Sequence, residues 1–231
     1  MYSVILQMQN EVTEYAQKIE EICKIDKDVD NLYLGCQIYY TPLKDEPSNL
    51  MFVGINPGSG GFKERRDIKT LPLLKSEYET EEYNLQKEWK YVFGEKNINN
   101  LNLLYDSFKT NCCFFATENE TNLRKLKSIL KYKYRIDLLQ KEKEWIPLLI
   151  NHVYPKVIIC EGFGSFNALK KIYSKEYLTG EWTNGTNTKI AYLSQHPNEF
   201  TPVIGFKRIY STYYEIDNIP DTIRKALDGN L

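Results

Sequence analysis

Short runs of consecutive apolar residues constrain the fold of this 231-residue chain more than any other feature. A short apolar run that ends in glycine or in polar residues is typical of a strand buried on both faces, which is the usual strand of a parallel sheet. Four segments are strand candidates: LMFVGI at 50–55, KTNCCFFATEN at 109–119, KVIICEG at 156–162 and KIAYLSQHP at 189–197. The pair Asn184-Gly185 is a turn signal just before the last of them.

Helical patterns alternate with these runs. Residues 2–25 carry apolar side chains at spacings of three and four, which places them on one stripe: Ile5, Met8, Val12, Tyr15, Ile19 and Ile22. Further helices are expected in a basic region from about residue 121, before Pro155, at 163–173 and at 218–230. The alternation predicts an α/β fold, with a mainly parallel central sheet flanked by helices. We expect one domain over residues 1–231, with the helix 2–25 packed on it.

Composition limits the function classes. Hydrophobic content of 42% and charged content of 26% are ordinary for a soluble globular protein, and no apolar run is long enough to span a bilayer. We expect no signal peptide from the first residues, and the five cysteines form no C-x-x-C pair, so we expect reduced thiols and a cytoplasmic protein. The net charge of −1 argues against a surface covered in nucleic acid, although a local basic face remains compatible with it. We expect a monomer that makes no membrane contact.

Three segments place polar residues where a strand candidate meets a loop: Gly54–Gly58, Asn111–Phe115 and Ser194–Asn198. In open α/β sheets, ligands bind beyond the carboxyl ends of the strands. Each segment alone fits an ordinary turn, because Asn, Pro and Gly are common turn residues. As a set, they predict three loops that converge at one edge of a single sheet.

Taken together, four motifs resemble the uracil-DNA glycosylase superfamily in order and spacing: GINPG at 54–58, TNCCFF at 110–115, YPKVIICEGFGSFNAL at 154–169 and SQHPN at 194–198. The resemblance covers roughly residues 50–205. GINPG is similar to the mismatch-specific branch, and the His-Pro loop is similar to the single-strand-selective monofunctional branch. The resemblance implies a three-layer fold and a DNA glycosylase that hydrolyses the N-glycosidic bond of uracil or another altered pyrimidine in DNA, without a cofactor.

The chemistry suggests which residues act. Hydrolysis of the bond gives a sugar with oxocarbenium character and an anionic leaving base, so water must be held on the far face of the sugar. Asn56 suits that task, because its carbonyl accepts from water while its NH₂ fixes the amide. Pro57 stiffens the loop, and Gly58 lets backbone approach a ligand closely. An Asx-type turn is the simpler interpretation of the same residues.

Charge on the leaving base and recognition of its edge need further groups. An imidazole N–H of His196, directed at a base carbonyl, would stabilise the charge, and the amide of Asn111 can pair with O4 and N3–H of uracil. The simpler interpretations are a loop histidine and a strand-initiating or capping asparagine. Phe62 is a candidate for stacking on the base, with a core role as the alternative and Phe114 or Phe115 as competitors. The substrate-binding set is Gly54, Ile55, Pro57, Gly58, Phe62 and Asn111.

Extrusion of a nucleotide needs a wedge and phosphate contacts. Phe200 is the candidate wedge, Pro197 and Asn198 form the loop before it, and Ser165 lies at the expected N-terminus of a helix, where anions bind. Glu199 and Asn198 depart from the superfamily pattern. A basic run suits a solvated helix face better than nucleic acid: Arg124, Lys125, Lys127, Lys131, Lys133 and Arg135.

Two alternatives stay open beside the glycosylase. The fold could be a catalytically inactive module that recognises bases and binds DNA, or it could be an enzyme that acts on a free nucleoside. We predict no metal site, because an iron–sulfur cluster needs four placed cysteines. Cys112 and Cys113 are expected on opposite faces of a strand, and the other cysteines are scattered.

Overall fold

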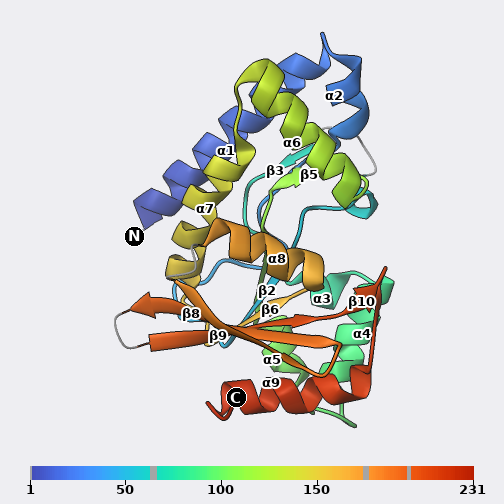
Figure 1. The fold of residues 1–231 in the computed structure, drawn as a ribbon, viewed down its shortest axis with the longest axis vertical. Helices are drawn as coiled ribbons and strands as arrows, with labels where there is room; N and C mark the ends of the chain where they lie inside the picture. Colours follow the sequence, from blue (N-terminus) through green and yellow to red (C-terminus); the bar gives the residue numbers. More distant parts are fainter. Residues whose placement is uncertain (1, 63–66, 174–176, 197–198) are drawn as a thin grey trace.

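The computed structural model describes residues 2–62, 67–173, 177–196 and 199–231. Its centre is a six-stranded sheet in the order β4-β2-β6-β9-β8-β7 (Figure 1). The first four strands in that order are parallel, and β8 pairs antiparallel with both β9 and β7. The prediction of a mainly parallel α/β fold is therefore confirmed. The strands are β2 Leu50–Gly54, β4 Phe108–Asn111, β6 Val157–Cys160, β7 Leu178–Asn184, β8 Thr188–His196 and β9 Glu199–Phe206.

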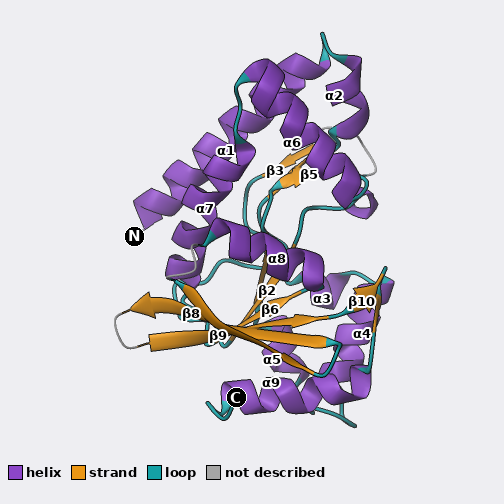
Figure 2. Cartoon of the chain, viewed as in Figure 1, coloured by secondary structure: helices purple, strands orange, loops and turns teal. Residues whose placement is uncertain are grey.

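Helices cover both faces of this sheet (Figure 2). Alternate side chains of β2 point to opposite faces, so Met51 and Val53 belong to one core and Leu50 and Phe52 to another. The first core includes apolar residues of α1 Tyr2–Cys23, α6 Glu120–Tyr134, α7 Leu138–Val153 and α8 Phe163–Ile172. The second includes those of α4 Asn84–Phe93, α5 Leu101–Tyr105 and α9 Ile219–Leu227. The arrangement gives two helical layers with the sheet between them.

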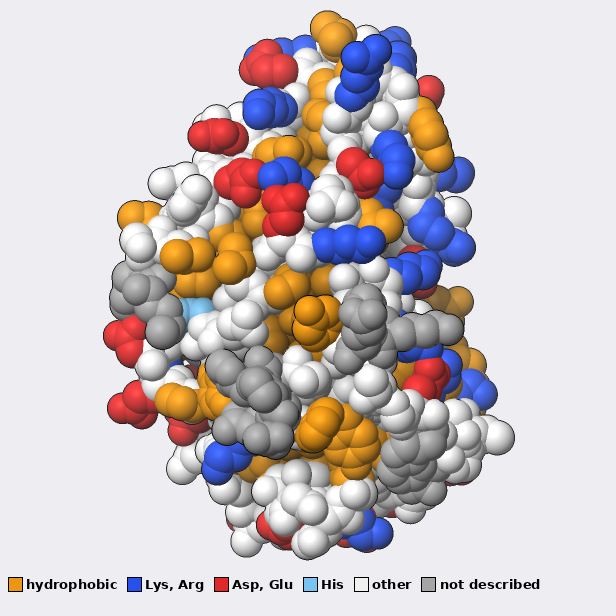
Figure 3. Space-filling view, turned by 60° about the vertical axis from the view of Figure 1, so that its left-hand side comes forward, with side chains coloured by type: hydrophobic (Ala, Val, Ile, Leu, Met, Phe, Trp, Pro, Cys, Tyr) orange, Lys and Arg blue, Asp and Glu red, His pale blue; other side chains and the backbone are white. Residues whose placement is uncertain are grey.

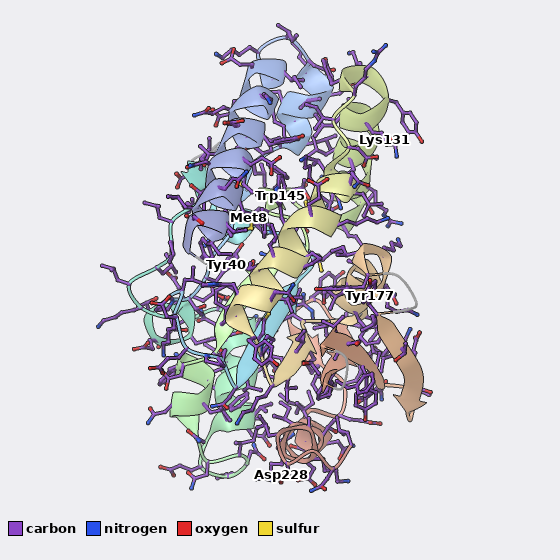
Figure 4. The ribbon with its side chains drawn as sticks, turned by 90° about the vertical axis from the view of Figure 1, so that its left-hand side faces the viewer. Met8, Tyr40, Lys131, Trp145, Tyr177 and Asp228 are labelled. Atoms are coloured by element: carbon purple, nitrogen blue, oxygen red, sulfur yellow. The ribbon has the colours of Figure 1, made fainter. Side chains whose placement is uncertain are left out.

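The expected N-terminal helix is α1, which ends at Cys23 and packs through the predicted stripe. Trp145 of α7 contacts α1, because its indole nitrogen donates to Oε2 of Glu11, at 2.7 Å, and Figure 4 labels Trp145 and Met8 of α1. The segment 63–105 includes α4, α5 and the short helix α3 Glu77–Thr80. Other short elements are α2 Lys27–Leu32, η1 Ser59–Gly61, β10 Arg208–Ile209, β11 Thr212–Tyr213 and η2 Ile216–Asn218. None of the helices in the described ranges is both long and apolar enough to cross a membrane.

A second, three-stranded sheet corrects the expected strand at 109–119. Its order is β3-β1-β5, with β1 Gly35–Gln37, β3 Asp67–Lys69 and β5 Phe115–Ala116. The chain leaves the central sheet at Asn111 and enters the small sheet at Phe115. Cys112 and Cys113 lie between the two strands and are both buried in the first core. The expectation that they point to opposite faces of one strand is therefore wrong.

Candidate functional site

The carboxyl ends of β2, β4 and β6 meet at one edge of the sheet. Gly54 pairs with Asn111, and Val53 pairs with Cys160, the residue before Glu161. A Cβ added to Gly54 would collide with Oδ1 of Asn111 and would lie 3.4 Å from Oε2 of Glu161. Gly54 is therefore required here, because the Asn111 side chain lies directly against its backbone. The expected proximity of Gly54 and Asn111 is confirmed.

The side chain of Asn56 is held by two hydrogen bonds just beyond this edge. Its amide nitrogen donates to Oγ1 of Thr117, at 3.0 Å, and to the carbonyl of Pro57, at 2.9 Å. Thr117 is fully buried, and its own hydroxyl donates to the carbonyl of Asn119, at 2.9 Å. Among the described residues these bonds use only the nitrogen of the amide, so the carbonyl oxygen is the atom available to accept from a water.

The loop after Asn56 exposes its backbone. A Cβ added to Gly58 would meet no atom within 4 Å, so space surrounds this residue. Ile55 is half-buried beside the first turn of α8, where a Cβ on Gly164 would lie 3.5 Å from Ile55 Cδ1 and 3.3 Å from Oε2 of Glu120. A carboxylate is favoured near the N-terminus of a helix, and Glu120 would repel a phosphate approaching this turn.

Ser165 is not positioned to contact a phosphate. It is buried in α8, and its hydroxyl donates to the carbonyl of Gly162, at 2.8 Å. Gly162 itself has φ of +110°, a conformation that favours glycine, and a Cβ there would lie 3.0 Å from Nε of Arg208. Ser165 therefore stabilises the turn between β6 and α8, and the expectation of a DNA contact at this residue is wrong.

Phe62 packs as a core residue, the alternative to a stacking platform. It is buried, and a Cβ on Gly35 of β1 would lie 2.6 Å from its ring. Phe114 and Phe115 are also buried and pack on Trp145, with ring centroids 5.8 and 6.2 Å away. These three rings lie within packed surroundings and carry no stacking role in this structure.

The His-Pro segment lies at the other edge of the sheet, which corrects the expected convergence. His196 ends β8 and pairs with Glu199 at the start of β9, whereas Gly205 near the end of β9 pairs with Cys160. A strand rises about 3.3 Å per residue, so Glu199 and Gly205 of β9 lie about 20 Å apart along the strand. The backbone of His196 is therefore about 20 Å, along the strand direction, from the level of Cys160. Because β8 runs antiparallel to its neighbour, its end cannot join the ends of β2, β4 and β6.

The wedge candidate shares that remote position. Phe200 pairs with Ser194 and is 60% exposed, so it is accessible, but it lies at the edge opposite to Asn56. Pro197 and Asn198 lie outside the described residues. The expected grouping of Phe200 and His196 with Asn56 and Asn111 around one nucleotide is therefore wrong.

A buried ionic cluster, which the sequence analysis did not identify, lies directly beneath the edge. Nζ of Lys109 in β4 is 2.6 Å from Oε1 of Glu77 and 2.9 Å from Oε1 of Glu161. Each of these three side chains is at least 90% buried. Burial by itself lowers the pKa of a lysine, but the carboxylates of Glu161 and Glu77 outweigh burial and hold the pKa of Lys109 well above its ordinary value.

Tyrosines enclose this cluster. The hydroxyl of Tyr83 donates to Glu77, at 2.6 Å, and that of Tyr78 donates to Oε1 of Glu161, at 3.2 Å. The Lys109 ammonium also lies 5.0 to 5.7 Å from the ring centroids of Tyr40, Tyr78 and Tyr83. The available sequence signal is a lysine at the start of the strand expected at 109–119, together with a glutamate immediately after the apolar run of β6.

Exposed cations lie on α6, one turn or more from Glu120. In the view of Figure 3, many basic side chains lie on the upper half of the molecule, and Figure 4 labels Lys131 of α6 in the upper half as well. Lys127, Lys131 and Lys133 form ion pairs with Glu142, Asp137 and Asp26. Arg124 and Lys125 are exposed at the end of α6 that is nearest to Asn56.

Comparison with known proteins gives no assignment. A scan against protein-family models finds no match, and a search of curated proteins finds no similar sequence. Within the described part of the chain, no group of three or more His, Cys, Asp or Glu side chains could hold a metal ion. The function is therefore inferred from the geometry of this edge and from the motifs that form it.

Proposed function

We propose that this protein is a monofunctional DNA glycosylase that hydrolyses the N-glycosidic bond of an altered pyrimidine, with water positioned by Asn56. The observation that supports the proposal most is the anchored Asn56 amide, whose nitrogen is held by Thr117 and the Pro57 carbonyl. An oriented carbonyl oxygen can hold a water molecule, although it is too weak a base to remove a proton. Such orientation suffices where the leaving base departs early.

The base would lie against the loop after β2. Gly54 lies two positions before Asn56 in the sequence and contacts the side chain of Asn111. An amide that can recognise a base edge therefore lies close to the residue that orients water. The phosphate backbone would follow the exposed side chains of Arg124 and Lys125 on α6. This path begins one turn along α6 from Glu120, whose carboxylate disfavours a phosphate beside Gly164.

Replacement of Asn56 tests the proposal. In a duplex or a single strand carrying one altered pyrimidine, Asn56→Ala should lower the single-turnover rate of base release by about 100-fold or more, as expected for loss of a positioned group. Asn167→Ala, which changes an exposed asparagine on α8, is the matched control and should keep the rate. An Asn56→Ala variant that releases the base at the wild-type rate would remove Asn56 from the reaction.

A second candidate is a base-recognition module without catalysis. The observation that favours it is the position of His196, whose backbone pairs with Glu199 at the opposite edge, about 20 Å from the level where β6 ends. This candidate predicts measurable affinity for an oligonucleotide with an altered base and no abasic product. Base release by the wild-type protein that is lost in Asn56→Ala would exclude it.

A further inference from the structure

The carboxylate of Glu161 has two different oxygens. Oε1 is anchored by the ammonium of Lys109, at 2.9 Å, and by the hydroxyl of Tyr78, at 3.2 Å. Oε2 is turned toward Gly54 and lies 3.4 Å from the position of a Cβ on that residue. Among the described residues, the side-chain hydrogen bonds of Glu161 all use Oε1, so Oε2 remains an acceptor directed at the proposed base site.

The neighbouring amide of Asn111 presents a second acceptor on the same side. Its Oδ1 is the atom that lies against Gly54, because a Cβ on that residue would lie 2.0 Å from it. This oxygen is an acceptor, and Oε2 of Glu161 lies near the same Cβ position on Gly54. Asn111 and Glu161 are each 5% exposed, so both acceptors are largely shielded from bulk water.

Two adjacent acceptors, one of them anionic, need a ligand with two adjacent donors. Uracil presents O4, N3–H and O2, so its single donor is flanked by two acceptors that a carboxylate would repel. A cytosine protonated at N3 presents N4–H and N3–H side by side, together with a positive charge. This edge matches Oε2 of Glu161 and Oδ1 of Asn111 in both hydrogen bonding and charge.

We propose that Glu161 is a specificity-determining residue and that the base bound at this edge is an aminopyrimidine of the cytosine type. The inference rests on the proposed function and names its substrate class. Lys109 acts as a positioning residue, because it holds Oε1 of Glu161 and thereby orients Oε2. Glu77 contacts the same ammonium but is not among the groups that meet at Gly54.

The same pairing makes hydrolysis feasible without an imidazole. A proton from solvent binds N3 of the base, and the resulting cation is stabilised by the carboxylate of Glu161. The C1′–N1 bond then breaks with its electron pair on N1, so the base leaves as a neutral molecule. Water held by Asn56 adds to C1′ and gives up one proton to solvent, which balances the proton taken up at N3.

The test compares two substrates that differ only at C4 of the pyrimidine. One oligonucleotide carries 5-hydroxymethylcytosine and the other carries 5-hydroxymethyluracil at the same position, in single-stranded and duplex form. The wild-type protein should release or bind the cytosine member at least tenfold better, since a site built for a donor rejects an analogue without it. Glu161→Gln should reduce that ratio by about tenfold, whereas the matched control Glu142→Gln, which neutralises a buried carboxylate paired with Lys127, should preserve it.

The outcomes separate the inference from the proposed function. Wild-type preference for the uracil member, or an equal change of the ratio in both variants, would overturn the role of Glu161 while leaving a glycosylase in place. Binding and release of neither oligonucleotide would count against the proposed function and the inference together. Thermal unfolding of each variant shows whether that variant is folded. If Glu161→Gln does not fold, the wild-type ratio still decides the substrate class.

Discussion

At the scale of single residues, the site depends on a glycine, Gly54, at the end of β2. Gly54 ends a strand whose other four residues are fully buried, and its missing Cβ provides the space that the Asn111 side chain occupies. A lysine in the neighbouring strand is then paired with carboxylates from two other segments. Removing one partner of a buried pair typically costs about 3–5 kcal/mol, so the groups around Gly54 are held firmly.

Gly54→Ala tests this close packing. The added methyl group should displace the Asn111 amide, lower the affinity for an altered base by about tenfold or more, and cost about 1–3 kcal/mol in the free energy of unfolding through overpacking. Chemical denaturation and oligonucleotide binding measure the two effects. Asn167→Ala, at an exposed position of α8, is the control. Equal affinities in the two variants would contradict the arrangement around Gly54.

At the scale of elements, strand direction decides which loops can cooperate. The sequence indicated the strands that contain Val53, Ile159 and Ala191 from their apolar runs, because burial on both faces leaves that pattern. It did not indicate that β8 runs antiparallel, since the direction of a strand depends on its pairing partners and not on its own residues. The position of His196 was therefore predicted wrongly, whereas the neighbouring ends of β2 and β4 were predicted correctly.

His196→Ala should leave base binding and release within about twofold of wild type, because β8 ends about 20 Å from the level where β6 ends. The measurement is the single-turnover rate on the oligonucleotide that the wild-type protein prefers. Asn56→Ala, assayed beside it, provides the comparison. A loss in His196→Ala similar to that in Asn56→Ala would show that the imidazole acts at the base and that the edge assignment is wrong.

Helix contacts at the other end of the molecule give a pH prediction. Asp26 caps α2 and accepts from Nζ of Lys133 and the hydroxyl of Tyr134 of α6, each at 2.7 Å. These hydrogen bonds, first from Lys133 and then from Tyr134, hold the pKa of Asp26 well below its ordinary value. A depressed pKa in the folded state stabilises the fold above the pKa of the unfolded chain, which is about 4, and this stabilisation is lost as the pH falls.

Thermal unfolding between pH 7 and pH 3 tests that link. Asp26→Asn should lower Tm at pH 7, and the difference from wild type should shrink progressively as the pH falls below about 4, where the unfolded chain takes up a proton that the folded carboxylate still resists. Asp45→Asn, at an exposed position in a turn, is the control and should track wild type throughout. A constant difference between Asp26→Asn and wild type across this range would contradict the assignment.

At the scale of the whole molecule, two hydrophobic cores lie on opposite faces of the central sheet. One core holds α1, α6, α7 and α8 against the sheet, and the other holds α4, α5 and α9 on the opposite face. The periodicity of residues 2–25 predicted the buried stripe of α1 because an amphipathic helix needs only its own residues to show one apolar face. The ionic cluster escaped prediction, because Lys109, Glu77 and Glu161 come from three distant segments that only tertiary packing brings together.

The basic end of α6 tests the proposed path of the phosphate backbone. The double variant Arg124→Glu/Lys125→Glu should weaken binding to all oligonucleotides and should reduce the salt dependence of binding by about 0.9 per lost duplex phosphate contact. Lys87→Glu/Lys96→Glu makes the same change in net charge at exposed positions in and after α4, on the other face of the sheet. Similar salt slopes in both double variants would contradict the assigned path.

The enclosed lysine has one more consequence. An amine attacks a sugar aldehyde only after it has lost its proton, and the ammonium of Lys109 is held between two carboxylates and surrounded by tyrosine rings. It is thereby withheld from imine formation with the deoxyribose that base removal would leave behind. Lys109 would therefore leave the phosphodiester bonds of the strand intact, and a monofunctional glycosylase would depend on a separate lyase or endonuclease to cut at the baseless position.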